Sequence, residues 1–318
     1  MEERLIAILR LAIKYNATDI HFTLRYFDIV IELRVNGVCK RIKTNIDDYK
    51  LIRYLQYLAN LDIGNSLLPQ TGQFEIEVDN NTLSLRFALI NNNSLSNGVL
   101  RILNNELRID VKHLSNIKQQ NAYFKSLLNN KIGLVLFSGP TGSGKTTTLY
   151  SLLNSIKNKK IFTLEDPIEV YNDNFIQVQI NESIGLDYAS GIKQVLRHDP
   201  DVIMIGEIRD EKAAKMAVTA ANTGHLVLST IHSSSSSSCI SRMVELGVNE
   251  AHLYENLICI ANQRMMYDKQ NKKKTVLYEI MDKNEITFFR LYGCNSSNFL
   301  SVEQQIDKGI RDGIFIQE

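Results

Sequence analysis

The stretch GLVLFSGPTGSGKTTTLY, residues 133–150, decides the fold class of this chain. An apolar run leads into a glycine-rich turn and then into residues that favour a helix, so the stretch predicts strand, loop and helix in that order. Within it, Gly139, Gly144, Lys145 and Thr146 match the phosphate-loop pattern G-x-x-x-x-G-K-[ST] in full. At average glycine usage, a chain of this length would contain the pattern by chance about one time in a hundred.

The spacing of this motif suits a nucleoside triphosphate, and ATP with Mg²⁺ is the expected ligand. Gly142 and Gly144 let the backbone close around phosphate, because neither residue has a Cβ, and the following amides lie at a helix start. Lys145 is expected to reach the β- and γ-phosphates, and the Thr146 hydroxyl to hold Mg²⁺. A glycine-rich turn without a ligand is the alternative. The predicted binding residues are Gly139, Pro140, Thr141, Gly142, Ser143, Gly144, Lys145, Thr146 and Thr147.

Length and composition narrow the class of protein. The 318 residues are enough for two domains with separate cores, and 36 basic against 35 acidic residues give no general attraction for a polyanion. Direct nucleic-acid binding is therefore not expected. The apolar runs are shorter than the roughly 18 residues of a membrane helix. The cysteines lack zinc-like spacing and are expected to be reduced, as in the cytosol; they are Cys39, Cys239, Cys259 and Cys294.

The first part of the chain predicts a small α+β domain with an antiparallel sheet. Alternating apolar residues and hairpin signals predict strands at 29–35, 38–43, 74–78, 83–90 and 99–103, with helices near the N-terminus and at 47–61. Arg86 and Arg101 each lie in the middle of an apolar strand. Their residue pattern alone favours a solvated strand face or an ion pair at the edge of the core.

The second part alternates strands with helices, which predicts a parallel sheet covered by helices on both faces. The expected strands are 134–137, 161–164, 202–205 and 226–231, and the expected helices are 145–157, 188–197 and 210–222. In such sheets ligands bind at the carboxyl ends of the strands.

Four candidate catalytic residues flank these strands. Glu165 follows 161–164, Glu207 follows 202–205, and His225 and His232 bracket 226–231. We expect Glu207 to serve Mg²⁺ and water, and an imidazole to contact the γ-phosphate and report its loss. The alternatives are a helix cap for each acid and a satisfied core position for each histidine.

The tail carries two less informative stretches. Ser233–Ser238 is expected to be a flexible turn leading into a helix at 239–246. The basic run at 269–274 is expected to be a solvated loop, with an electrostatic contact to anionic lipid or to an acidic protein surface as the alternative.

Taken together, the motifs resemble a known family. GPTGSGKTTTLY, TLEDPIE, GLDYASGIKQVLRHDPDVIMIGEIRD and TGHLVLSTIHS resemble, in this order, the Walker A, Asp box, Walker B and His box of the secretion ATPases that drive type II secretion and type IV pilus assembly. The resemblance extends to ATDIHF at 17–22, LRVNG at 33–37 and LLPQTGQF at 67–74. It implies a RecA-like P-loop ATPase domain at 113–318, a small PAS-like α+β domain at 1–112, a linker around 110–120 and a homo-hexameric ring.

The resemblance also implies roles for individual residues. Glu165 becomes the candidate that positions or deprotonates the attacking water, and Glu207 the Walker B acid near Mg²⁺. His225 and His232 become the His-box pair. Arg86 and Arg101 match arginines that, in the family, come from the N-terminal domain and reach the nucleotide, so the resemblance implies arginine-finger-like roles for both.

Departures from the family pattern refine the expectation. After Gln263-Arg264 the chain continues as MMYDKQNKKKTVLYEIM, without the four-cysteine insertion of many relatives, so zinc is not expected. ATDIH begins at residue 17, which implies that the additional N-terminal domain of those relatives is missing. Gln73 stands where the family commonly has arginine, which puts one basic contact in doubt.

A compact chain of this kind looks most like the competence ATPases of Gram-positive bacteria. That likeness implies a cytoplasmic motor at the inner face of the membrane, acting on a polytopic platform protein and, through it, on pilin subunits during DNA uptake. A pilus retraction motor and a type II secretion ATPase are alternatives within the family. A RecA-like nucleic-acid translocase and a nucleotide-gated scaffold are alternatives from other classes.

Overall fold

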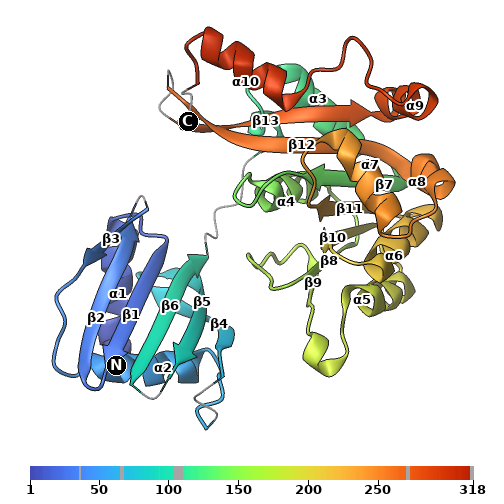
Figure 1. Cartoon of the computed structure of the whole chain (residues 1–318). Helices are drawn as coiled ribbons and strands as arrows, with labels where there is room; N and C mark the ends of the chain where they lie inside the picture. The colour runs from blue at the N-terminus through green and yellow to red at the C-terminus, as the bar shows by residue number, and fades with distance from the viewer. Residues whose placement is uncertain (36, 65–67, 93, 104–109, 270–272, 316–318) are drawn as a thin grey trace. The chain divides into compact units, whose positions relative to one another are not determined.

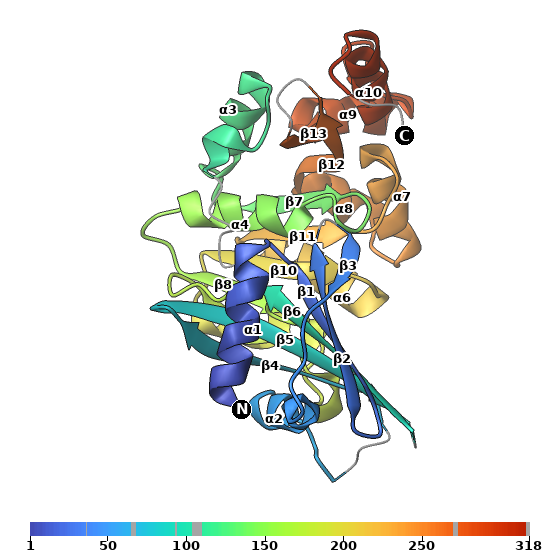
Figure 2. The same cartoon turned by 90° about the vertical axis from the view of Figure 1, so that its left-hand side faces the viewer.

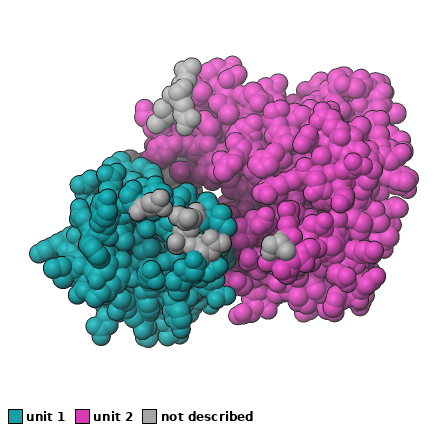
Figure 3. Space-filling model, turned by 60° about the horizontal axis from the view of Figure 1, so that its bottom comes forward, with its two compact units in different colours: residues 1–105 teal, residues 106–318 magenta. Residues whose placement is uncertain are grey.

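The computed structural model describes the chain except for residues 36, 65–67, 93, 104–109, 270–272 and 316–318. The chain divides into two units, Met1–Asn105 and Glu106–Glu318, here called unit 1 and unit 2 and coloured separately in Figure 3. That these units are independent domains with a boundary near residue 112 stays a prediction. In the described part of the chain, no helix is both long and apolar enough to cross a bilayer.

Unit 1 is a six-stranded antiparallel sheet with helices on one face. The strands lie in the order β3-β2-β1-β6-β5-β4 and comprise β1 Asp19–Arg25, β2 Asp28–Val35, β3 Val38–Arg41, β4 Gln70–Val78, β5 Asn81–Asn91 and β6 Leu95–Leu103. Figure 2 shows α1 (Glu2–Lys14) and α2 (Leu51–Leu58) against this sheet. Phe22 and Phe87 meet edge to face inside the core at 6.5 Å. The predicted α+β class is confirmed, although β1 was not predicted as a strand.

Unit 2 is built on a seven-stranded sheet in the order β13-β12-β7-β11-β10-β8-β9 (Figure 1). All neighbouring strands are parallel except β12 and β13, which form an antiparallel pair. The strands are β7 Gly133–Ser138, β8 Ile161–Glu165, β9 Ile176–Gln179, β10 Val202–Ile208, β11 Leu226–Ile231, β12 Leu257–Asp268 and β13 Lys273–Asp282. The predicted parallel α/β sheet is confirmed, and β9, β12 and β13 are additions to it.

Helices cover both faces of this sheet, which explains why a central strand such as β7 is buried along its whole length. On one face lie α3 (Lys118–Leu127) and α4 (Lys145–Ser155), whose apolar side chains share a core with β7. On the other face a second core includes α5 (Tyr188–Val195), α6 (Glu211–Asn222), α7 (Ser236–Glu245) and α8 (Glu250–Asn256). The tail adds α9 (Lys283–Tyr292) and α10 (Val302–Arg311) beside β12 and β13 (Figure 1).

Three expectations about loops are corrected by the structure. The segment 110–120, expected to be a linker, belongs to unit 2, because Val111 and Leu114 are buried in its core. The serine run is not a flexible turn throughout, because α7 begins at Ser236 and Ser235 caps it by accepting a hydrogen bond from the Ser238 N–H. In the basic run, Lys274 lies in β13 instead of in a loop, and 270–272 lie outside the described residues.

A buried carboxylate in β13 joins two helix starts in unit 2. The Glu279 side chain accepts hydrogen bonds from the N–H groups of Ser236 (2.6 Å) and Val302 (3.1 Å), the first residues of α7 and α10. Negative charge is favourable at helix N-termini. We expect Glu279→Ala to lower the free energy of unfolding by about 2–4 kcal/mol, because two buried amides lose their acceptor. Urea unfolding followed by circular dichroism measures this loss.

The matched control for this prediction is Glu245→Ala. The Glu245 side chain is 64% exposed and pairs only with Arg242 among its described contacts, so its removal should change stability by about 0.5 kcal/mol or less. Equal effects of the two substitutions would contradict the capping role of Glu279.

Candidate functional site

A pocket of about 540 Å³ lies where β7, β8, β10 and β11 of unit 2 end. This volume is in the range of small-molecule sites, and the position is the one expected for ligands of parallel sheets. The pocket brings together most of the predicted site residues of unit 2. Its polar lining includes Thr141, Lys145, Thr146, Thr147, Glu165, Asp166, Glu169, Glu207, Thr230, His232 and Lys274.

The phosphate loop has the backbone that its glycines predict. Gly139, Gly142 and Gly144 adopt φ values of 137°, 79° and 89°, in the region that disfavours L side chains. At Gly139 a Cβ would also come within 2.3 Å of the Gln263 carbonyl oxygen, whereas at Gly142 it would meet nothing within 4 Å. Gly142 and Gly144 line the pocket, whereas Gly139, Pro140 and Ser143 support the loop from outside it.

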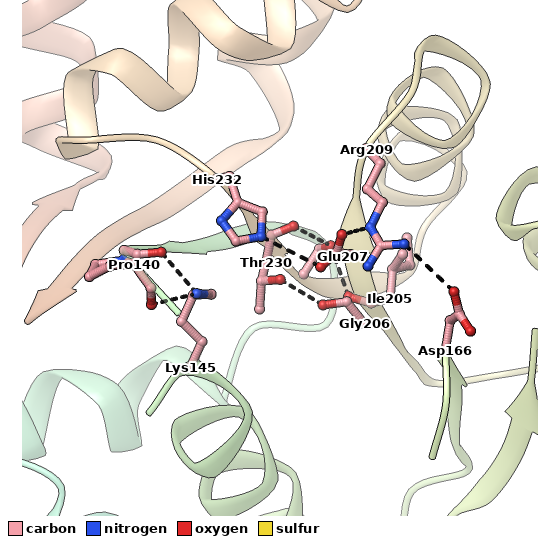
Figure 4. A network of polar contacts seen from close by, with 11 residues as sticks. Pro140, Lys145, Asp166, Ile205, Gly206, Glu207, Arg209, Thr230 and His232 are labelled. Carbon is pink, nitrogen blue, oxygen red and sulfur yellow. Dashed lines mark hydrogen bonds and ion pairs between the residues drawn. The ribbon is translucent and has the colours of Figure 1, made fainter. Parts of the chain in front are cut away.

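Lys145 is the first residue of α4, and its amine points back along the phosphate loop (Figure 4). Its Nζ donates hydrogen bonds to the carbonyl oxygens of Gly139 (2.8 Å) and Pro140 (3.0 Å). Burial, and then the positive charge of Arg264, lower the pKa of Lys145. An anion in the pocket would offset both effects, since it supplies negative charge at the amine.

Glu207 stands at the centre of a charged cluster at the end of β10 (Figure 4). Its carboxylate forms an ion pair with Arg209, and a second oxygen lies 3.6 Å from Nε2 of His232. Arg209 also lies 3.6 Å from Asp166. Burial, and then the charges of Lys145 and Arg209, lower the pKa of His232, which favours the neutral form of its imidazole. Sequence reasoning missed Arg209, although its place two residues after Glu207 was a usable signal.

A bulge in β10 displays Glu207. The pairing of β10 with β11 shifts register between Ile205 and Ile208, as at a β-bulge, where one strand carries an extra residue. Two hydroxyl groups of β11 satisfy the carbonyl groups at the irregularity: Ser229 Oγ donates to Ile205 O (2.9 Å) and Thr230 Oγ1 to Gly206 O (2.7 Å). The local backbone is therefore fixed by β11 and not by Glu207 itself.

Glu165 lines the pocket, but its carboxylate lies in a buried hydrogen-bond network. The residue is 4% exposed, and its oxygens accept hydrogen bonds from Tyr150, Thr163 and Gln177. Burial raises the pKa of Glu165; the three donors oppose this change, and the nearby charge of Glu169 adds to it. Tyr150 and Gln177 could not be predicted as partners of Glu165, because they lie on α4 and β9 and Glu165 lies on β8.

The expected position of His225 is wrong. His225 precedes β11, and its carbonyl accepts from the N–H of Gly133 at the start of β7, so it lies at the amino edge of the sheet. Because β11 has 6 residues, the two edges are about 20 Å apart. The His225 ring contacts the Ala220 carbonyl at the end of α6 (3.0 Å). Only His232 of the pair lines the pocket, and the proposed nucleotide site of the chain excludes His225.

Strand β12 braces the phosphate loop from the side away from β11. Gln263 is fully buried, and its Nε2 donates to the carbonyl oxygen of Ser143 (2.7 Å). The neighbouring Asn262 is also fully buried and donates to Ser138 Oγ (2.8 Å), at the end of β7. In the sequence, Gln263-Arg264 served only to locate the position of the missing four-cysteine insertion, and the contact of Gln263 with the phosphate loop was not predicted.

The two candidate arginines lie on unit 1, side by side on strands β5 and β6, where Arg86 is the register partner of Arg101. Arg101 forms an ion pair with buried Asp19 at 2.7 Å. Burial alone would raise the pKa of Asp19, but Arg101 and the Thr18 hydroxyl hold it below its ordinary value. Among the described residues, Arg86 has no ionic partner. Contact of either arginine with a nucleotide stays a prediction.

The polar groups at the pocket also fit Mg²⁺. The Thr146 hydroxyl and the Glu207 carboxylate are oxygen donors, the type that Mg²⁺ prefers when phosphate and water complete its shell. Within the described ranges, no cluster of three or more His, Cys, Asp or Glu side chains could hold a metal by itself. The donor set is thus one that would hold the ion together with a triphosphate.

Comparison with known proteins places the chain among secretion proteins. The model of the family described as type II/IV secretion system protein matches residues 1–307. The chain is 38% identical to competence protein ComGA of Bacillus subtilis over 79% of this chain and 72% of that protein. It is 36% identical to ComGA of Halalkalibacterium halodurans, over 85% and 84% of the two chains. It is 35% identical to type II secretion system protein E of Pseudomonas aeruginosa over 82% of its own length, and spans 53% of that protein.

Solved structures agree with this assignment. The crystal structure of the pilus retraction motor PilT with bound ADP gives a TM-score of 0.75 at 26% identity, and the match covers 98% of this chain and 94% of that one. The ATPase DotB of Legionella pneumophila, at 21% identity and a TM-score of 0.74 over 98% and 92% of the two chains, shares the fold. With its phosphate loop, its parallel sheet and a match over nearly its whole length, the chain belongs to the family of type II/IV secretion system proteins.

Proposed function

We propose that the chain is an ATPase that hydrolyses ATP to ADP and phosphate and uses the energy to assemble a type IV pilus-like competence pseudopilus for DNA uptake. The observation that carries the proposal is the convergence of Lys145, Thr146, Glu165, Glu207 and His232 on one pocket of unit 2. The similarity to ComGA over most of both chains supports the competence role.

In this proposal each residue does a separate task. The amides of the phosphate loop and the amine of Lys145 bind the β- and γ-phosphates. Thr146 and Glu207 would hold Mg²⁺, which would supply positive charge to neutralise the phosphates. Glu165 orients the attacking water and accepts its proton. His232, 3.6 Å from the carboxylate of Glu207, senses the loss of the γ-phosphate.

The proposed assembly is a homo-hexamer in which Arg86 and Arg101 of unit 1 stabilise the transferred phosphoryl group. The hexamer works in the cytoplasm at the inner face of the membrane. There it binds a polytopic platform protein and through it moves pilin subunits. A change in the angle between the two units after hydrolysis supplies the movement. The lack of an ionic partner for Arg86 among the described residues supports this role, since its guanidinium is available to an anion.

Arg86→Gln is expected to lower kcat for ATP hydrolysis by roughly a hundredfold or more, because an arginine that stabilises transition-state charge contributes at least that much. The KM for ATP should change less, since the phosphate loop supplies ground-state binding. Phosphate release by the purified full chain measures both constants. Arg41→Gln is the matched control: Arg41 lies on the same sheet, and its side chain is 76% exposed. An Arg86→Gln protein as active as this control would contradict the role.

Cells test the proposed function directly. Cells that carry Lys145→Ala in place of the natural chain should lose both pseudopili and DNA uptake. Normal pili that no longer shorten would instead support the second candidate, retraction, which the structural likeness to PilT favours. Hydrolysis that rises strongly when DNA is added to the purified protein would favour a nucleic-acid translocase.

A further inference from the structure

Tyr150 lies where it can connect the phosphate loop to the proposed base. It is on α4, the helix that begins at Lys145, and it follows Thr146 by four residues, so both project from the same side of that helix. Tyr150 is 1% exposed, and its ring packs edge to face on Phe175 at 5.8 Å. The apolar packing holds the ring in place, so the hydroxyl group is not needed to fix the side chain.

That hydroxyl group contacts both oxygens of Glu165, at 2.8 and 3.0 Å. Gln177 of β9 completes the arrangement: its amide lies 2.9 Å from the Tyr150 oxygen and 2.9 Å from the carbonyl oxygen of Val170. The same amide also lies 3.2 Å from Glu165, and the Tyr150 oxygen lies 3.0 Å from the Val170 carbonyl oxygen. If Gln177 donates one proton to Val170 and shares the other between Tyr150 and Glu165, the Tyr150 proton remains for the carboxylate, and Thr163 donates a further one at 2.6 Å. Every proton then has an acceptor while Glu165 is ionised.

We propose that Tyr150 is a positioning residue for hydrolysis: its hydroxyl group holds the carboxylate of Glu165 at a fixed place relative to the phosphate loop. This inference rests on the proposed function, in which Glu165 is the base. Helix α4 connects the phosphate loop to Glu165, because Lys145 and Thr146 occupy its first turn and Tyr150 lies on its second turn. A displacement of α4 by ligand would therefore move the hydroxyl group that holds the base.

The Tyr150 hydroxyl group affects the protonation of Glu165, because other titratable groups and burial also act on this carboxylate. The titratable groups around it are Tyr150 of α4, Tyr188 of α5, Glu169 after β8, and the other titratable groups that line the pocket: Lys145, Asp166, Glu207, His232 and Lys274. Burial raises the pKa of Glu165, and the Tyr150 hydrogen bond is one of three that oppose this change. Removal of the hydroxyl group raises the pKa further, so less of the base is ionised at a given pH.

The test compares Tyr150→Phe with Tyr278→Phe in the full chain. Tyr278 is the matched control, because it is also 1% exposed and its hydroxyl group binds a residue of α4, Thr148 at 2.8 Å, without contact to Glu165. Tyr150→Phe should lower kcat by about tenfold or more and leave the KM for ATP nearly unchanged, because a misplaced base affects the chemical step. Tyr278→Phe should leave kcat within about twofold of the natural chain, since an ordinary buried hydrogen bond mainly affects stability.

The dependence of kcat on pH distinguishes a positioning role of Tyr150 from a role in folding alone. Activity requires ionised Glu165 and is lost as the pH falls through its pKa. Tyr150→Phe should therefore move the acidic limb to higher pH by about one unit, since a hydrogen bond to a charged group is worth roughly that much. The limb should not move in Tyr278→Phe. Equal kcat values, or equal acidic limbs, in the natural and Tyr150→Phe proteins would overturn the proposal.

Glu165→Gln distinguishes failure of the inference from failure of the proposed function. If Glu165→Gln is inactive and Tyr150→Phe is fully active, the positioning role alone is wrong. If Glu165→Gln is fully active, both are wrong. A further measurement needs no activity: Tyr150→Phe should lower the Tm of the ligand-free protein more in the natural background than in Glu165→Gln, because a hydrogen bond to a carboxylate is stronger than one to an amide. Equal Tm losses in the two backgrounds would overturn the link between Tyr150 and Glu165.

Discussion

Lys145→Ala is expected to reduce ATP hydrolysis by roughly a hundredfold to a thousandfold, because the pocket loses the cation that offsets phosphate charge at the phosphate loop. The amine lies within 3.0 Å of two loop carbonyl oxygens, so it is held at the loop before any phosphate arrives. Its loss should also weaken nucleotide binding. Phosphate release and titration with a fluorescent ATP analogue measure the two effects on the same protein.

Lys193→Ala is the control for this substitution. Lys193 is an exposed lysine of α5 that does not line the pocket, so the substitution removes the same charge from the chain without touching the site. It should leave hydrolysis and nucleotide binding unchanged. Similar losses in the two variants would mean that net charge, and not the phosphate loop, determines activity.

Glu165→Gln is expected to abolish hydrolysis while ATP binding persists. The amide keeps the size of the side chain but cannot accept the proton of the attacking water, and general-base catalysis contributes roughly a hundredfold to ten-thousandfold. The kcat should fall by that factor, and the fluorescent ATP analogue should bind with its natural affinity. Stopped hydrolysis with retained binding identifies a residue that acts in the chemical step.

Glu169→Gln is the matched control for Glu165→Gln. Glu169 follows the same strand and lines the same pocket, and its charge raises the pKa of Glu165. Because Gln carries no charge, Glu169→Gln should lower the pKa of Glu165 and leave kcat at neutral pH within about twofold of the natural value. An inactive Glu169→Gln protein beside an active Glu165→Gln protein would move the role of base to Glu169.

The parts of the site that could be predicted from the sequence are local. The phosphate loop depends on glycines, a lysine and a threonine within eight consecutive residues, so its backbone could be predicted without any tertiary contact. Glu207 could be placed because it follows a strongly apolar strand, and the carboxyl ends of parallel strands meet at one edge. Both features line the same pocket in the structure.

The contacts that surround these residues are not local and could not be predicted. Tyr150 meets Glu165 only because α4 packs beside β8, and Gln263 meets Ser143 across 120 residues of chain. No periodicity or spacing in one sequence encodes such pairs. Arg209 is different, because it lies two residues after Glu207, and this short spacing was a usable signal.

The errors have specific physical causes. His225 and His232 flank one strand, and the direction of β11 puts only His232 at the carboxyl edge. The serine run was expected to be a flexible turn, yet Ser236 is buried in the first turn of α7, where tertiary contacts override the weak helix preference of serine. The linker at 110–120 was implied by the family resemblance, but Val111 and Leu114 bury their side chains in unit 2.

Motor activity is tested most directly by phosphate release from ATP and Mg²⁺ by the purified full chain, with nucleotide binding measured in the same preparation. We expect steady release by the natural protein, none above background by Glu165→Gln, and retained binding of ATP by both. A natural protein that binds ATP but releases no phosphate, alone or as a hexamer, would contradict the claim that the pocket at the ends of β7, β8, β10 and β11 is the active site of a motor.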